Sequence, residues 1–212
     1  MDSWNGLEPY LVHIVTVVIV IGMILSFLRR KRGSEAWRAF ALKHGFQHAP
    51  PRSPSLFSSR SAVAFRDPGE VRGTVHNLPF RLQVEIQGTG RNRSVHTVMT
   101  AEIPNLPAGL TICHENTFLK ITKFFGAQDI KTGDPRFDAA FVVKGNDPAS
   151  ALLWLDGSRR SAILSVLEKN PDMDIREGCL RFQRNEIIDD PKELERALLS
   201  FETLAPNLQS RR

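Results

Sequence analysis

The chain has 212 residues, a formal net charge of +5 and an apolar content of 42%. Apart from one long apolar run near the N-terminus, the length suffices for one well-packed domain and not for two. The two cysteines, Cys113 and Cys179, form no Cys-x-x-Cys pair, which argues against a structural zinc site of the thiolate type. Their separation and apolar surroundings are typical of free thiols in a reducing compartment.

The first element in the chain is the uninterrupted apolar run Leu11–Leu28. As a helix it has a length of roughly 27 Å, close to the hydrocarbon thickness of a bilayer. We therefore expect a single transmembrane helix over 10–28, preceded by a short extracytoplasmic leader over 1–9. The charge that follows the run argues against a cleaved signal peptide, which carries its positive charge before the apolar stretch.

A basic cluster of four residues follows the run directly: Arg29, Arg30, Lys31 and Arg32. Cationic residues on this side predict that the N-terminus lies outside and the rest of the chain in the cytoplasm. Lys and Arg also outnumber Asp and Glu over 29–93 but not over 94–212. Anionic lipid headgroups are the natural counter-charge, although a simple stop-transfer role explains the cluster as well. Nucleic acid is not an expected partner, because the other cationic residues are scattered and not grouped with aromatics.

A short amphipathic helix is expected within the basic juxtamembrane segment 29–47. Ser34 can cap it, Trp37 and Phe40 form its apolar stripe, and Gly45 can end it in the left-handed conformation. The stripe has two interpretations, packing on the following domain or lying on a membrane surface, and the first is favoured. The stretch 48–61 is rich in Pro and Ser and predicts an irregular linker.

The segment 62–206 shows the alternation of an antiparallel sheet. Two runs, 71–75 and 80–86, are joined at Asn77-Leu78-Pro79 as a hairpin, and Gly88–Arg93 forms a second turn before a strand over 95–103. Shorter strands are expected at 110–114, 118–122, 141–143, 173–176 and 180–184. Helices are expected at 149–155, 160–167 and 191–204, the last with Pro191 in its first turn. The predicted class is α+β, with a few short helices, a docked C-terminal helix and a disordered tail over 207–212.

One motif, in the segment Asp129–Leu155, resembles a known pattern. It reads Gly-Asp-x-x-Phe-Asp and then Phe-Val-Val-x-Gly-Asn-Asp, and it is similar to a family of uncharacterised prokaryotic, membrane-associated domains of unknown function. The resemblance implies a prokaryotic, membrane-associated protein of undetermined function and transfers no catalytic residue. With the predicted topology, we expect a single-pass protein of the bacterial inner membrane. Physically, Asp134 would lie in a turn, Phe137 would be buried and Asp138 would cap a backbone amide. The alternative is that Asp134 and Asp138 form a carboxylate pair for a cation or for acid–base chemistry.

Other constellations give weaker signals. His76, His96 and His114 lie on three predicted strands, but their spacing matches no metal motif, and no metal or cofactor is expected. Gly88-Thr89-Gly90 lacks the lysine of a phosphate loop. No serine lies in a nucleophile-elbow sequence, so no catalytic residue is assigned.

Three functional hypotheses follow from these patterns. The favoured one is a membrane-anchored cytoplasmic protein that acts as a non-enzymatic binding or scaffolding module, with the lipid bilayer and a membrane protein as its partners. The second is a module that senses anionic lipid through its arginines, and the third is an unrecognised hydrolase. The oligomeric state is left open.

Overall fold

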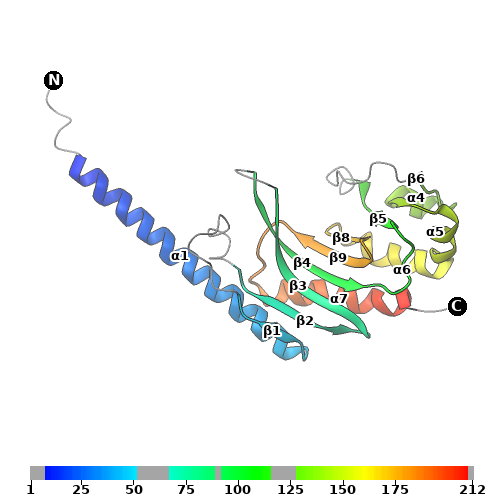
Figure 1. Ribbon diagram of the computed structural model, residues 1–212, viewed down its shortest axis with the longest axis horizontal. Coiled ribbons are helices and arrows are strands. Elements are labelled where there is room, and N and C mark those ends of the chain that lie inside the picture. Colours follow the sequence, from blue (N-terminus) through cyan, green and yellow to red (C-terminus); the bar gives the residue numbers. More distant parts are fainter. Residues whose placement is uncertain (1–7, 52–66, 89–91, 116–127, 210–212) are drawn as a thin grey trace, which may run out of the picture.

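The chain folds into one mixed sheet-and-helix unit, and it is seen here in a computed structural model (Figure 1). The structure describes residues 8–51, 67–88, 92–115 and 128–209, and within its first helix it leaves the side chains of residues 8–12, 23, 26, 27, 29 and 30 undescribed. The described part has the α+β, antiparallel architecture expected for the domain.

The strands form one nine-stranded sheet, in which every pair of neighbours runs antiparallel. They are β1 (Gln47–Ala49), β2 (Glu70–Val75), β3 (Leu78–Gln87), β4 (Ser94–Glu102), β5 (Thr111–Cys113), β6 (Gln128–Asp129), β7 (Val142–Gly145), β8 (Met173–Arg176) and β9 (Cys179–Arg184). Their order across the sheet is β1-β2-β3-β4-β9-β8-β5-β7-β6. The late hairpin β8–β9 thus inserts between β4 and β5, which follow one another in the sequence.

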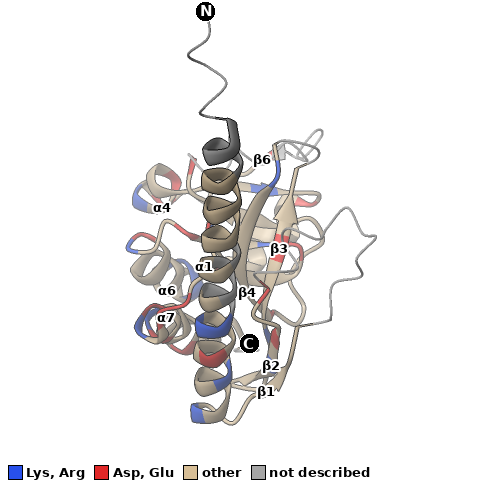
Figure 2. Cartoon of the chain, turned by 90° about the vertical axis from the view of Figure 1, so that its left-hand side faces the viewer, with Lys and Arg blue, Asp and Glu red and all other residues tan. Residues whose placement is uncertain are grey.

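The helices lie together on one side of the strands (Figure 2). They are α1 (Glu8–Lys43), α4 (Pro135–Ala140), α5 (Pro148–Trp154), α6 (Gly157–Leu167) and α7 (Pro191–Gln209). The start of α4 is fixed by the N-cap Asp134 and that of α5 by the N-cap Asp147, each followed by a proline at the first helical position.

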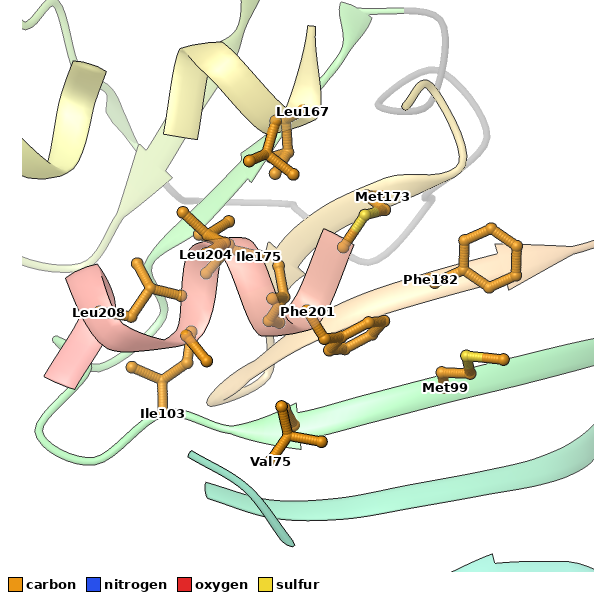
Figure 3. Close-up of a cluster of buried hydrophobic side chains, with 14 of the residues drawn as sticks. Val75, Met99, Ile103, Leu167, Met173, Ile175, Phe182, Phe201, Leu204 and Leu208 are labelled. Carbon is orange, nitrogen blue, oxygen red and sulfur yellow. The ribbon is translucent and has the colours of Figure 1, made fainter. Parts of the chain in front are cut away.

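The hydrophobic core fills the space between the sheet and α7 (Figure 3). Phe201 of α7 is fully buried and packs edge-on against Phe80 of β3, with ring centroids 5.6 Å apart. Met99 and Ile175 are also fully buried and carry the same core across β4 and β8. The alternation of the sequence predicted this face of β2, β3 and β4.

The C-terminal part of α1 belongs to this core. Trp37 is fully buried and donates a hydrogen bond from Nε1 to the carbonyl oxygen of Ile188 at 2.9 Å, while Phe40 is 2% exposed. The helix is followed by Gly45, whose φ of 68° is the left-handed conformation expected there. Packing of the Trp37 and Phe40 stripe on the domain is therefore confirmed over the membrane-surface alternative.

The N-terminal part of α1 projects away from the domain (Figure 1). Over the part of the chain whose side chains are described, no helix is both long enough and apolar enough to cross a bilayer. This finding contradicts the transmembrane helix predicted at 10–28, and with it the single-pass topology and the localisation at the bacterial inner membrane. The apolar run is also not the separate element that was expected: one helix of 36 residues continues through the basic cluster into the packed Trp37 stripe.

Several element boundaries differ from the predicted ones. The β2–β3 turn lies at His76 and Asn77, both with positive φ, so Pro79 falls inside β3 and not in the turn. Helix α7 continues to Gln209, and Leu208 is 1% exposed, because its side chain completes the core beyond the expected end at 204. The strand expected at 118–122 and most of the linker expected at 48–61 lie outside the described residues.

Candidate functional site

The sheet has a second face, turned away from the helices that the structure describes. Because side chains alternate along a strand, the residues between the core positions point to this side. We call it the helix-free face, and it is formed by Gln47 and Ala49 of β1, Glu70, Arg72 and Thr74 of β2, Arg81, Gln83 and Glu85 of β3, Ser94, His96, Val98, Thr100 and Glu102 of β4, Cys179, Arg181 and Gln183 of β9, Asp174 and Arg176 of β8, Thr111 and Cys113 of β5, Val142 and Lys144 of β7 and Asp129 of β6. It is rich in charged and polar side chains, in contrast to the apolar face beneath the helices.

The centre of this face is a connected network of ion pairs and hydrogen bonds. Arg181 donates to both carboxylate oxygens of Glu85, at 3.3 Å and 2.5 Å, and its side chain is only 10% exposed. The oxygen Oε1 of Gln183 accepts hydrogen bonds from Arg176 at 3.0 Å and from Arg181 at 3.2 Å. Asp174 pairs with Arg176, with 3.1 Å between Oδ1 and Nε. Each charged group of the network thus has an ion-pair partner, but Asp174 Oδ1, Arg176 Nε and Arg181 Nε are buried without a hydrogen bond, so the desolvation of these charges is only partly compensated.

This network explains the burial of Val98, a fully buried apolar residue on the helix-free face. Val98 lies between Gln83 and Gln183 in the register of the sheet. The Arg181–Glu85 ion pair joins β9 to β3 and so crosses β4, which carries Val98. Long charged side chains in such a position cover apolar surface with their aliphatic parts.

The pKa values of the two carboxyl groups of this network, Asp174 and Glu85, are shifted in opposite directions. It raises the pKa of Asp174 to about 6, since desolvation outweighs the attraction of Arg176 and Arg181. Burial acts in the same direction on Glu85, but the hydrogen bonds and charge of Arg181 outweigh it and leave the pKa of Glu85 below its usual value. Of these two carboxyl groups, Asp174 is thus the one that changes charge closer to neutral pH.

The thiol of Cys113, near Asp174, is not activated as a nucleophile. Cys113 is fully buried, and burial raises its pKa to about 12, with the nearby charge of Asp174 acting in the same direction. Cys179 is half-buried, and its pKa is raised chiefly by the same cause. Because the thiolate is the reactive form, neither cysteine has the acidity of a nucleophile.

A Ser–His contact on β4 invites comparison with a catalytic pair. Ser94 Oγ lies 2.7 Å from His96 Nε2, and His96 Nδ1 lies 3.2 Å from the amide nitrogen of Gln183. The Gln183 oxygen is held by the two arginines, so its amide nitrogen faces the histidine and donates to Nδ1. A neutral His96 then carries its proton on Nε2 and donates to Ser94, which is the wrong tautomer for a base that activates a serine. The arrangement supports a structural role.

The carboxylates of the Gly-Asp-x-x-Phe-Asp motif serve their own backbone. Asp134 Oδ1 accepts from the backbone N–H groups of Arg136 and Phe137 at 3.0 Å and 3.2 Å. Asp138 accepts from the backbone and hydroxyl of Thr132, both at 2.9 Å, and from the backbone of Gly133 at 3.1 Å, and these hydrogen bonds hold the pKa of Asp138 below its usual value against the opposing effect of burial.

Together these contacts fix the start of α4. Phe137, which lies between the two aspartates in the sequence, is fully buried as predicted. Asp134 also lies 3.9 Å from Arg160. The geometry therefore explains the motif by the folding of a turn and one helical turn after it. The resemblance of this segment to an uncharacterised family stays a prediction.

The remaining predicted residues do not assemble into one site. His76 lies in the β2–β3 turn, His96 in the network, and His114 Nε2 lies 2.8 Å from the carbonyl oxygen of Leu167. Among the residues that the structure describes, no group of three or more His, Cys, Asp or Glu side chains is placed to hold a metal ion.

The basic cluster on α1 lies apart from the helix-free face. Lys31 lies 3.9 Å from Glu35 in an exposed i,i+4 pair, and Arg32 is exposed. The side chains of Arg29 and Arg30 lie outside the described residues. Those apolar side chains before the cluster that the structure describes are 42–62% exposed, and nothing in the described structure shows what covers them.

A second charged group lies at the outer end of the helix-free face, on β2 and β3. Glu70 Oε1 is 2.8 Å from Arg72 Nε and 3.2 Å from Arg81 Nε, and Glu70 Oε2 is 2.8 Å from the terminal nitrogen of Arg72. Arg72 and Arg81 are 59% and 49% exposed, whereas Glu70 is 24% exposed. Sequence reasoning missed this group; the alternation of β2 and β3 placed its members on one face, but the pairing register that joins them was not readable.

Comparisons with known proteins give no relative: no family model, no curated protein and no solved structure matches this chain.

Proposed function

We propose that this chain is a non-enzymatic binding module that presents the outer end of the helix-free face, on β1, β2 and β3, to a protein partner. The observation that carries the proposal is the exposed charge on this part of the sheet. The side chains of Arg72 and Arg81 are about half-exposed, next to exposed Gln47 and Thr74. Arginine in such a position is typical of protein interfaces.

The chemistry of the described side chains supports binding over catalysis. Ser94 contacts a histidine in the wrong tautomer, the cysteines have raised pKa values, and Asp134 and Asp138 cap backbone amides. Each candidate nucleophile or base is thus already used by the fold or deactivated by it. A hydrolase built on these residues is not favoured by this geometry.

The test is site-specific photo-crosslinking of the full-length chain in its host cells. A photoreactive phenylalanine analogue replaces Thr74 on the helix-free face, and in a matched variant it replaces Leu199, which is 61% exposed on α7. We expect one crosslinked protein from the Thr74 position, competed away by excess unlabelled chain and absent from the Leu199 position. The identified protein, once purified, must also bind the wild-type chain directly. Equal labelling at both positions, or none at Thr74, would overturn the proposal.

A further inference from the structure

The pairing of β2 with β3 sets two arginines directly opposite one another. Arg72 and Arg81 are register partners in the antiparallel ladder. Like charges at such a position repel, at a cost of a few tenths to about 1 kcal/mol relative to a neutral pair. This pair does not stabilise the sheet by itself, and an anion placed between the two arginines would remove the repulsion.

Glu70 supplies only part of that negative charge. Its carboxylate contacts both arginines, which leaves one excess positive charge on the group of three. Two ion pairs at the centre of the same face are matched one to one: Glu85 with Arg181 and Asp174 with Arg176. Within the described part of the helix-free face, the Glu70 group is the ion pair in which a single carboxylate serves two guanidinium groups.

The three side chains are also layered. Glu70 is the least exposed at 24%, and the two guanidinium groups are the more exposed members. Arg72 uses both Nε and a terminal nitrogen on Glu70, whereas the contact from Arg81 is made through Nε. An incoming carboxylate therefore meets guanidinium donors first, and Arg81 retains the terminal nitrogens that suit a two-point contact.

The neighbouring positions suit an extended polar segment. Thr100 lies opposite Arg81 on β4, Gln47 lies opposite Arg72 on β1, and Thr74 follows on the same face. These uncharged side chains can donate or accept hydrogen bonds, and none of them repels an anion.

We infer that Arg72 and Arg81 form a binding site for the carboxylate groups of an acidic protein segment. The inference rests on the proposed function, because it names the chemistry of the partner that the helix-free face receives. Exposed charge pairs contribute little individually, so binding needs several carboxylates and weakens with salt.

The test measures binding of a fluorescein-labelled peptide of ten glutamates to the full-length chain by fluorescence anisotropy at low salt. A peptide of ten lysines is the probe control. The variants are Arg72→Gln with Arg81→Gln, and separately Glu70→Gln. The matched control is Arg136→Gln, which removes a 75% exposed arginine that pairs with Glu168 on another part of the surface.

The expected signs are opposite for the two variants. The double arginine variant lowers affinity for the acidic peptide at least tenfold, the Glu70→Gln variant raises it several-fold by releasing both guanidinium groups, and Arg136→Gln leaves it unchanged. Circular dichroism confirms that each variant is folded, and a rise in salt from 50 to 300 mM weakens wild-type binding.

The inference fails if the acidic peptide does not bind, if the arginine variant binds as wild type does, or if Glu70→Gln weakens binding. It also fails if 10 mM inorganic phosphate binds the pair and displaces the peptide completely, since the site would then select phosphate over carboxylate. The proposed function fails separately, by loss of the position-specific crosslink from Thr74. If the crosslink persists in the double arginine variant, the proposal of a binding module is supported and the inference of an acidic partner is overturned.

Discussion

The two faces of the sheet use different physics to bury their side chains. The face beneath the helices buries Phe80, Met99 and Ile175 against α7 by removing apolar surface from water. The helix-free face buries Asp174 and Arg181 among polar partners, where each lost hydration shell must be replaced by a specific contact. On the first face a substitution should therefore reduce stability in proportion to the side-chain volume that it removes. On the second face the loss of stability depends on which charged or polar partner is left behind.

The largest effect is expected on the apolar face, from Trp37→Ala. Trp37 is fully buried, and its loss leaves a cavity and removes the donor to the Ile188 carbonyl. We expect a loss of about 3–5 kcal/mol in the free energy of unfolding. Urea titration followed by far-UV circular dichroism measures it, with Leu42→Ala, a 72% exposed position on the same helix, as the control. A loss below about 1 kcal/mol would show that this part of α1 is not docked as described.

On the polar face the largest effect is expected from Arg181→Met. The change leaves the partly exposed Glu85 without its bidentate partner and removes a positive neighbour of the buried Asp174, so both carboxylates lose compensating charge. We expect a loss of about 3 kcal/mol, since breaking one partner of a buried pair costs more than the pair contributes.

The double variant Arg181→Met with Glu85→Gln should recover at least about 1 kcal/mol of that loss, because the uncompensated charge is gone. The surface control Arg196→Met, at a 73% exposed arginine, should cost less than about 0.5 kcal/mol. Equal losses for the single and double variants would show that Arg181 acts by packing, and the contrast between the two faces would weaken.

The sequence predicted the apolar face far better than the polar one. The period-two pattern over 71–103 indicated which residues of β2, β3 and β4 face the core, because that pattern is local. The Arg181–Glu85 pair joins residues nearly a hundred positions apart, and the pairing of β4 with β9 that brings them together follows from topology. The local pattern also predicted that Phe137 is buried and that Asp138 caps an amide, and the second depends only on hydrogen bonds within a few residues.

The apolar run shows the opposite failure of local reading. Its composition predicted a separate membrane-spanning element ending at the basic cluster, whereas the structure has one helix that continues to Lys43 and whose C-terminal part docks on the domain. The sequence gives no strong signal that the helix continues through Gly33 and Ser34. Serine is common as an N-cap but also occurs inside helices, so Ser34, predicted as a cap, lies in the interior of α1.

A third prediction sharpens the comparison through pH. Asp174 has a pKa raised from 3.8 to about 6 in the folded protein, so the folded state binds its proton more tightly than the unfolded state does. Stability from this group is fully present below about pH 3.8 and is lost as the pH rises through about 6. Asp174→Asn removes that loss, and we expect it to be more stable than wild type by about 1–3 kcal/mol at pH 8 and nearly equal at pH 4.

The measurement is urea unfolding of both proteins from pH 4 to pH 8, with Asp129→Asn as the control at a 67% exposed carboxylate. A difference between wild type and Asp174→Asn that does not change with pH would contradict the raised pKa. Destabilisation of Asp174→Asn at pH 8 would mean that the ion pair with Arg176 outweighs the burial of the charge.

The smallest effect is expected where the polar face meets solvent. Arg81→Gln removes one of two opposed arginines while Arg72 keeps its contact with Glu70, so relief of repulsion offsets the lost ion pair. We expect the free energy of unfolding, measured by urea titration, to lie within about 0.5 kcal/mol of wild type, and any change to be an increase. Glu70→Gln should instead destabilise the chain by up to about 1 kcal/mol, because it leaves both arginines opposed without an anion. If Arg81→Gln lowers the free energy of unfolding more than Glu70→Gln does, the arginine stabilises the fold. The expected order would instead mean that the fold does not need Arg81, which lies on the surface proposed to bind a partner.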